Sequence, residues 1–147
     1  MITFKQFIVE TIEQPVDWKW IQKYKDQWTA YFEINSIQYH VVIGQDDEIT
    51  TMWDMVFTTV NLPISKGMFD LTGTGNAFIV FSTVKQVIGN FINKNPQVQT
   101  LVFTAQGESR KKFYDRWSKQ IAQSIGNWHV RIIDKSVRKY VLSKPQS

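Results

Sequence analysis

The most informative part of the sequence is a helical pattern between residues 77 and 91. Seven apolar side chains recur there at intervals of three and four residues, as on one face of an α-helix: Ala77, Val80, Phe81, Val84, Val87, Ile88 and Phe91. Pro96 follows as a stop signal, and residues 98–104 then form an apolar, β-rich run. We therefore predict a buried helix followed by a strand from the centre of a sheet.

Shorter patterns predict the other elements. The apolar residues alternate with polar ones from residue 29, which predicts a hairpin with its turn near Asn35 and Ser36, and a third strand at 52–60. Residues 68–71 fit a short strand, 107–124 a second helix, and 128–133 and 139–143 two closing strands. Before the sheet, we expect an amphipathic helix in the first ten residues and another at 18–28.

The predicted fold class is α+β, a single mixed, mostly antiparallel sheet flanked by helices. A chain of 147 residues fits one domain. Without cysteine it cannot form disulfides or thiolate metal sites, and neither His40 nor His129 has the neighbours that a metal site or a catalytic triad requires. No apolar run is long enough for a membrane span and the N-terminus lacks a secretory signal, so we expect no membrane or metal and a cytoplasm-like compartment.

Positive charge is concentrated near the C-terminus. Residues 1–109 carry seven lysines against eleven acids, whereas residues 110–147 carry ten lysines and arginines against two. A local excess of this kind attracts phosphate-rich partners such as nucleic acid or the tail of a cofactor, and the alternative is a solvated basic face. The candidate nucleic-acid or anion ligands are Lys112, Arg116, Lys119, Arg131, Arg138 and Lys139.

A glycine turn precedes the buried helix. Its backbone N–H groups and the helix dipole would form an anion site, and the alternative is a tight turn with Asn76 as helix cap. Cations at 110–112 crowd the start of the second helix, where the dipole disfavours them and a bound anion would remove the conflict. The candidate cofactor-binding residues are Gly73, Thr74, Gly75, Asn76, Ala77 and Arg110.

Residues 29–143 resemble the GNAT acetyltransferase superfamily in the order of their elements and in this turn. The resemblance implies acetyl-CoA as cofactor, with its pyrophosphate at Gly73 and Gly75. It also implies Tyr114 as the general acid that protonates the leaving thiolate, and Asp54 on a central strand would be the base. The chain departs from the family pattern at Asp70, where the family has glutamine or arginine, and it lacks the Gly-Phe that usually follows Tyr114.

The first ten residues, MITFKQFIVE, resemble the capsid-targeting peptide of internal head proteins in large tailed bacteriophages. The family's protease cuts after the glutamate of such a peptide, which implies cleavage after Glu10 and a single acetyltransferase-like domain over 11–147. The resemblance implies a virion protein packed in the phage head, or one that acts in the host cytoplasm. The alternative is an ordinary amphipathic helix.

Three functions follow from these patterns. The first is a non-enzymatic bacteriophage protein, head-packaged or host-directed, that uses an acetyltransferase-like scaffold to bind a phage head or host protein. The second is an acetyl-CoA-dependent N-acyltransferase. The third is a nucleic-acid-binding module, which can coexist with the first. We favour the first because Asp70 would lie beside a pyrophosphate, where its charge is unfavourable.

Overall fold

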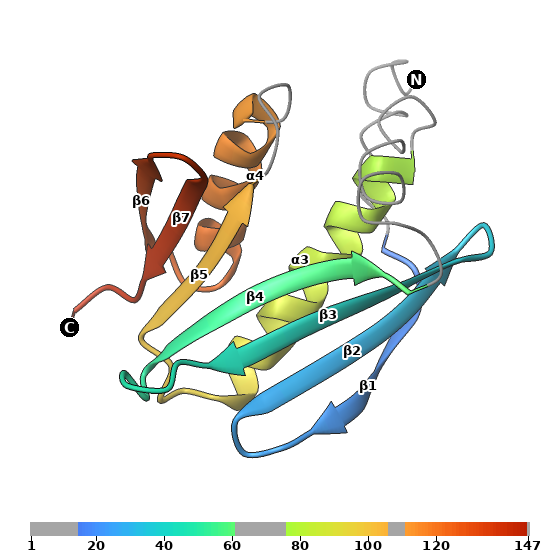
Figure 1. Ribbon diagram of the computed structural model, residues 1–147, viewed down its shortest axis with the longest axis horizontal. Helices are drawn as coiled ribbons and strands as arrows, with labels where there is room; N and C mark the ends of the chain where they lie inside the picture. The colour runs from blue at the N-terminus through green and yellow to red at the C-terminus, as the bar shows by residue number, and fades with distance from the viewer. Residues whose placement is uncertain (1–14, 61–75, 106–110, 147) are drawn as a thin grey trace, which may run out of the picture.

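The computed structural model describes residues 15–60, 76–105 and 111–146. Within these ranges the chain forms one seven-stranded sheet with strand order β1-β2-β3-β4-β5-β7-β6 and two helices (Figure 1). Every neighbouring pair is antiparallel except β4 and β5. The elements are β1 (Trp18–Lys23), β2 (Gln27–Ile34), β3 (Ile37–Gln45), β4 (Met52–Thr59), α3 (Asn76–Lys94), β5 (Thr100–Ala105), α4 (Lys111–Ser124), β6 (His129–Asp134) and β7 (Arg138–Ser143).

This architecture confirms the predicted fold class, an α+β domain with a mixed, mostly antiparallel sheet. The helix expected at 77–91 is α3, and the β2–β3 hairpin turns at Asn35 and Ser36 with φ angles of 51° and 68°. Those two angles match the type I′ turn that joins strands in a tight hairpin. The expected N-terminal helix, the strand at 68–71 and the start of the second helix lie outside the described residues.

The predicted helix over residues 18–28 is wrong. The segment forms β1, a turn closed by the Tyr24 N–H donating to the Gln27 carbonyl oxygen at 2.9 Å, and the start of β2. Trp20 and Trp28 do share a face, but they meet across two strands with ring centroids 5.0 Å apart. Tryptophan and tyrosine favour strands, so the spacing that suggested a helix was a coincidence of two inward-facing strand positions.

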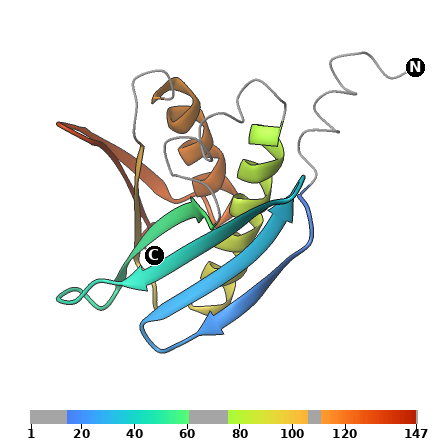
Figure 2. The ribbon, with the colours of Figure 1, turned by 45° about the vertical axis from the view of Figure 1, so that its right-hand side comes forward.

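Both described helices pack on the same face of the sheet (Figures 1 and 2). On this covered face, alternate strand residues meet the apolar stripe of α3, in which Val84, Val87 and Phe91 are fully buried. No described helix lies on the other face, which we call the uncovered face. Val56 of β4 is 55% exposed there. No helix in the described ranges is long and apolar enough to cross a membrane.

β4 and β5 are the one parallel pair among the described strands, and they pair over a short stretch. Met52, Trp53 and Asp54 of β4 lie opposite Thr100, Leu101 and Val102 of β5. Beyond these pairs the strands diverge (Figure 1). The sheet therefore consists of two halves, β1–β4 with α3 and β5–β7 with α4, joined along three residue pairs.

Candidate functional site

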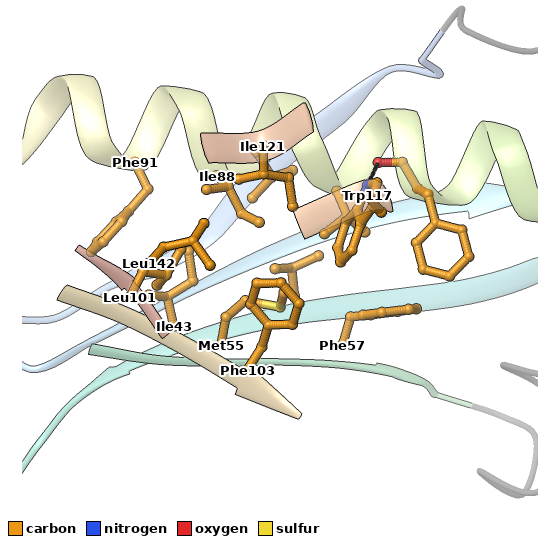
Figure 3. Packing of buried hydrophobic residues seen from close by; sticks show 14 of the residues in the cluster. Ile43, Met55, Phe57, Ile88, Phe91, Leu101, Phe103, Trp117, Ile121 and Leu142 are labelled. Atoms are coloured by element: carbon orange, nitrogen blue, oxygen red, sulfur yellow. Dashed lines mark hydrogen bonds between the residues drawn. The ribbon is translucent and has the colours of Figure 1, made fainter. Parts of the chain in front are cut away.

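The point where β4 and β5 diverge is filled by aromatic side chains on the covered face. Trp117 of α4 packs against side chains of both strands, with its ring centroid 6.5 Å from Phe57 of β4 and 5.4 Å from Phe103 of β5 (Figure 3). Its indole N–H donates to the carbonyl oxygen of Phe81 in α3 at 3.3 Å. The three rings are nearly fully buried. We call Phe57, Phe81, Phe103 and Trp117 the aromatic plug.

Tyr114, the candidate general acid, lies behind this plug. It is on the buried side of α4 and only 2% exposed. Its ring contacts Tyr140, Trp117 and Phe81, with centroid distances of 6.1, 5.8 and 5.7 Å. Tyr114 is therefore part of the hydrophobic core, and solvent does not reach it.

Asp54, the candidate base, is exposed on the uncovered face, because its neighbours Trp53 and Met55 point to the helices. Partial burial and the negative charge of Asp46 raise the pKa of Asp54, while the charge of Lys139 opposes this shift. Tyr114 and Asp54 thus lie on opposite faces of the sheet. The structure does not bring the two candidate catalytic residues together.

The six lysines and arginines predicted as nucleic-acid or anion ligands also lie on different surfaces. Lys112, Arg116 and Lys119 lie on the exposed side of α4, whereas Arg131 and Lys139 are exposed on the uncovered face of the sheet. The six residues therefore do not form one surface. Arg138 is separate from both groups, because it is largely buried in an ion-pair cluster.

This cluster joins α4 to β7. The Arg138 guanidinium donates to both carboxylate oxygens of Asp115, at 3.0 and 2.9 Å, and the Tyr140 hydroxyl donates to the same carboxylate at 2.6 Å. A further nitrogen of Arg138 lies 3.0 Å from Asp134. Such a bidentate, charge-assisted arrangement is strong and geometrically specific. Asp115, Asp134, Arg138 and Tyr140 form what we call the Asp115 cluster.

The cluster shifts the ionisation of its members. Partial burial alone would raise the pKa of Asp115, but the hydrogen bonds from Tyr140 and Arg138 and the arginine charge outweigh it, so the pKa lies below the usual value. Burial and the bond to Asp115 raise the pKa of Tyr140. Asp115 and Arg138 are 23 residues apart, so no local sequence pattern predicts their pairing. The spacing of Asp134 and Arg138, four residues, was the one local signal.

The remaining predicted ligands are only partly described. Asn76 and Ala77 are the first two residues of α3, as a site at a helix N-terminus requires. Gly73, Thr74, Gly75, Arg110 and Glu10 lie outside the described residues. Within the described ranges, no three histidine or acidic side chains form a group that could hold a metal ion.

No protein-family model matches the chain, and no curated protein sequence does. Among solved structures, the chain is similar to an acetyltransferase of the GNAT family from Streptococcus pneumoniae. The similarity covers 83% of this chain and 68% of that one, at 12% sequence identity and a TM-score of 0.41. Neither an activity nor a ligand is carried over from it.

Proposed function

We propose that this protein is a non-catalytic binding protein built on an acetyltransferase-like scaffold. The observation that carries the proposal is the placement of the two candidate catalytic residues: Tyr114 is 2% exposed on the covered face, beside the aromatic plug, whereas Asp54 is exposed on the uncovered face. General acid–base catalysis requires both groups to reach one reacting centre at hydrogen-bonding distance, about 2.6–3.2 Å. A buried acid and an exposed base on opposite faces of a sheet do not meet that requirement.

Isothermal titration calorimetry with acetyl-CoA, followed by an acetyl-transfer assay with a mixture of amines, tests this proposal. We expect no binding heat and no release of free CoA. Micromolar binding that is lost when Gly75 is replaced by a bulky residue would favour the N-acyltransferase alternative instead. A matched substitution at Gly44, on the uncovered face, controls for general effects of adding a side chain.

The resemblance of the first ten residues supports a bacteriophage protein, packed in the head or directed at a host protein. If the peptide is a targeting signal, protein taken from virions should begin at Thr11. Intact-mass measurement of that N-terminus is the test. Absence of the protein from purified particles would refute head packaging and leave host-directed binding, in the host cytoplasm, to be examined.

Nucleic-acid binding is a second candidate, favoured by the exposed row of Lys112, Arg116 and Lys119 along α4. The three residues follow one another at intervals of four and three positions, so they lie on one side of the helix. A gel-shift series at rising salt should show binding that weakens steeply if phosphates are the ligands. No shift at low ionic strength would remove this candidate.

A further inference from the structure

The outer side of α3 carries a groove of about 580 Å³. It adjoins a second hollow of about 290 Å³ between the C-terminal ends of α3 and α4, and the two share Gly89, Asn93 and Ser124. From Ser82 to Asn93 the groove follows the helix for about 16 Å, at 1.5 Å per residue. Six residues of α3 line it: Ser82, Lys85, Gln86, Gly89, Asn90 and Asn93.

Two amide groups of this groove are held in one orientation. The Trp18 indole N–H donates to Gln86 Oε1 at 2.8 Å, and the Trp20 indole N–H donates to Asn90 Oδ1 at 2.9 Å. An indole N–H is only a donor, so each amide must turn its oxygen toward the tryptophan. The amide nitrogens of Gln86 and Asn90, one helical turn apart, are thereby left to donate to a ligand in the groove.

Gly89 lies between these amides, in the interior of a 19-residue helix. Glycine in a helix interior is less favourable than alanine, so its presence at position 89 requires a structural or functional explanation. Packing does not supply one, because a Cβ on Gly89 would meet no heavy atom within 4 Å. A Cβ would instead project into both hollows. A glycine at this position allows a ligand to approach the helix backbone closely.

The charge of the groove defines its ligand. Lys85 lines the groove and Lys144 the adjoining pocket, and no acidic residue lines either among those the structure describes. The Lys144 ammonium already donates to the Pro96 carbonyl oxygen at 3.1 Å. Lys85 is the one cation among the described residues that line the groove itself, and a single cation over about 16 Å is too little for a run of phosphates. The groove is instead rich in neutral donors, which suit carbonyl oxygens.

We propose that this groove binds an extended, acidic peptide segment of a partner protein. Carbonyl groups on one side of an extended chain recur every second residue, about 6.6 Å apart. That spacing is close to the rise of about 6 Å along the helix between Gln86 and Asn90, which are four residues apart. The peptide carbonyls accept from Gln86 and Asn90, and a carboxylate pairs with Lys85. This inference deepens the proposed binding function by naming the surface and the class of partner.

Nuclear magnetic resonance of ¹⁵N-labelled protein tests the inference, because the side-chain NH₂ signals of Gln86 and Asn90 report on the groove directly. The probe is a terminally blocked peptide of alternating alanine and aspartate. We expect saturable shifts of both signals. A peptide of alternating alanine and lysine lacks the carboxylate for Lys85 and should shift them clearly less at the same concentration.

Gly89→Ala is the decisive variant. It should raise the melting temperature of the protein, since alanine favours the helix. It should also raise the dissociation constant of the aspartate peptide at least about fivefold. Loss of binding in a more stable protein cannot be attributed to unfolding. Gly44→Ala is the matched control, because a Cβ there also meets no atom within 4 Å but lies on β3, away from the groove. It should leave binding unchanged.

Several results would overturn the proposal. One is the absence of shifts with the aspartate peptide, and another is an equal effect of Gly89→Ala and Gly44→Ala. Shifts produced by inorganic phosphate or single-stranded oligothymidylate, without any from the peptide, would assign the groove to phosphate ligands. Each of these outcomes concerns α3 alone, so the acetyl-CoA titration still decides separately whether the protein is non-catalytic.

Discussion

The two halves of the sheet bury polar groups in different ways. In the β1–β4 half, the Tyr39 hydroxyl and the Trp53 indole N–H are buried without a hydrogen-bond partner. In the β5–β7 half, the hydroxyl of Tyr140, equally buried, donates to Asp115 at 2.6 Å. In the first half, Phe91 packs against Trp20, Trp28 and Trp53, and the side-chain hydrogen bonds from β1 to α3 join neutral groups. The second half depends in addition on charge, so acid should weaken it first.

The largest effect is expected at the aromatic plug, where the halves meet. Trp117→Ala removes a buried ring that touches both β4 and β5, and should lower the free energy of unfolding by about 3–5 kcal/mol. Urea denaturation followed by circular dichroism measures this. Trp18→Ala, which truncates a half-buried ring at the sheet edge, is the control and should cost clearly less. Equal losses would contradict the view that Trp117 joins the halves.

The Asp115 cluster should come next. Asp115→Asn keeps the shape but removes the charge that Arg138 and Tyr140 bind, and should cost about 1–3 kcal/mol at neutral pH. Asp134→Asn removes the more exposed partner of Arg138 and should cost about 0–1 kcal/mol. Chemical denaturation at pH 7 compares the two variants. A larger loss of stability from Asp134→Asn than from Asp115→Asn would contradict the central role of Asp115 in the cluster.

The same cluster predicts a pH dependence. The folded pKa of Asp115 lies below the usual 3.8, so its contribution is present above that value and is lost as the pH falls through the folded pKa. Wild-type protein should therefore lose stability on acidification below about pH 4 more steeply than Asp115→Asn. Thermal melts at a series of acidic pH values measure the two slopes. Parallel curves would count against this role of Asp115.

Tyr39 and Tyr140, both fully buried, offer a matched pair of substitutions with stability effects of opposite sign. Tyr140→Phe removes one of the three hydrogen bonds to the Asp115 carboxylate and should cost about 1–2 kcal/mol, whereas Tyr39→Phe removes an unpaired buried hydroxyl and should be neutral or stabilising by up to about 1 kcal/mol. Burial raises the pKa of Tyr39 to about 12 in the folded state. As the pH rises from 10 toward 12, this tyrosine ionises in the unfolded chain before it does in the folded one, so the folded state loses stability over that range. Denaturation of both variants at pH 7 checks the signs, and a loss from Tyr39→Phe would show that its hydroxyl has a partner.

The smallest effect is expected at the β2–β3 turn, far from the junction of the halves. Ser36 has a φ of 68°, which glycine adopts without strain. Ser36→Gly should therefore stabilise the protein by about 0.5–1 kcal/mol. Thermal denaturation measures the gain. A loss of stability would mean that the serine side chain stabilises the turn by more than the backbone strain that glycine relieves.

The elements that the sequence predicts well are those set by local pattern. α3 has an uninterrupted apolar stripe and a proline stop, and the β2–β3 turn has residues that tolerate positive φ. β1 was missed because a bulge after Trp20 breaks the alternation that marks a strand. Periodicity alone cannot identify a strand that lacks its regular period.

The site depends on contacts between distant residues and could be predicted much less. Asp115 and Arg138 meet only because α4 packs beside β7, and Trp20 meets Asn90 across 70 positions. Tyr114 and Asp54 could be proposed as an acid and a base from residue type. Their separation by the sheet is visible only once the register of β4 and the buried side of α4 are known.

The proposal that the protein does not bind acetyl-CoA is best checked by the melting temperature of the wild-type protein with and without acetyl-CoA. A ligand at 100 times its Kd adds about 2.7 kcal/mol to the stability of the folded state. In a chain of this size that corresponds to a rise of roughly 5–10 °C. We predict no change in melting temperature at millimolar acetyl-CoA. A rise of several degrees would contradict the account.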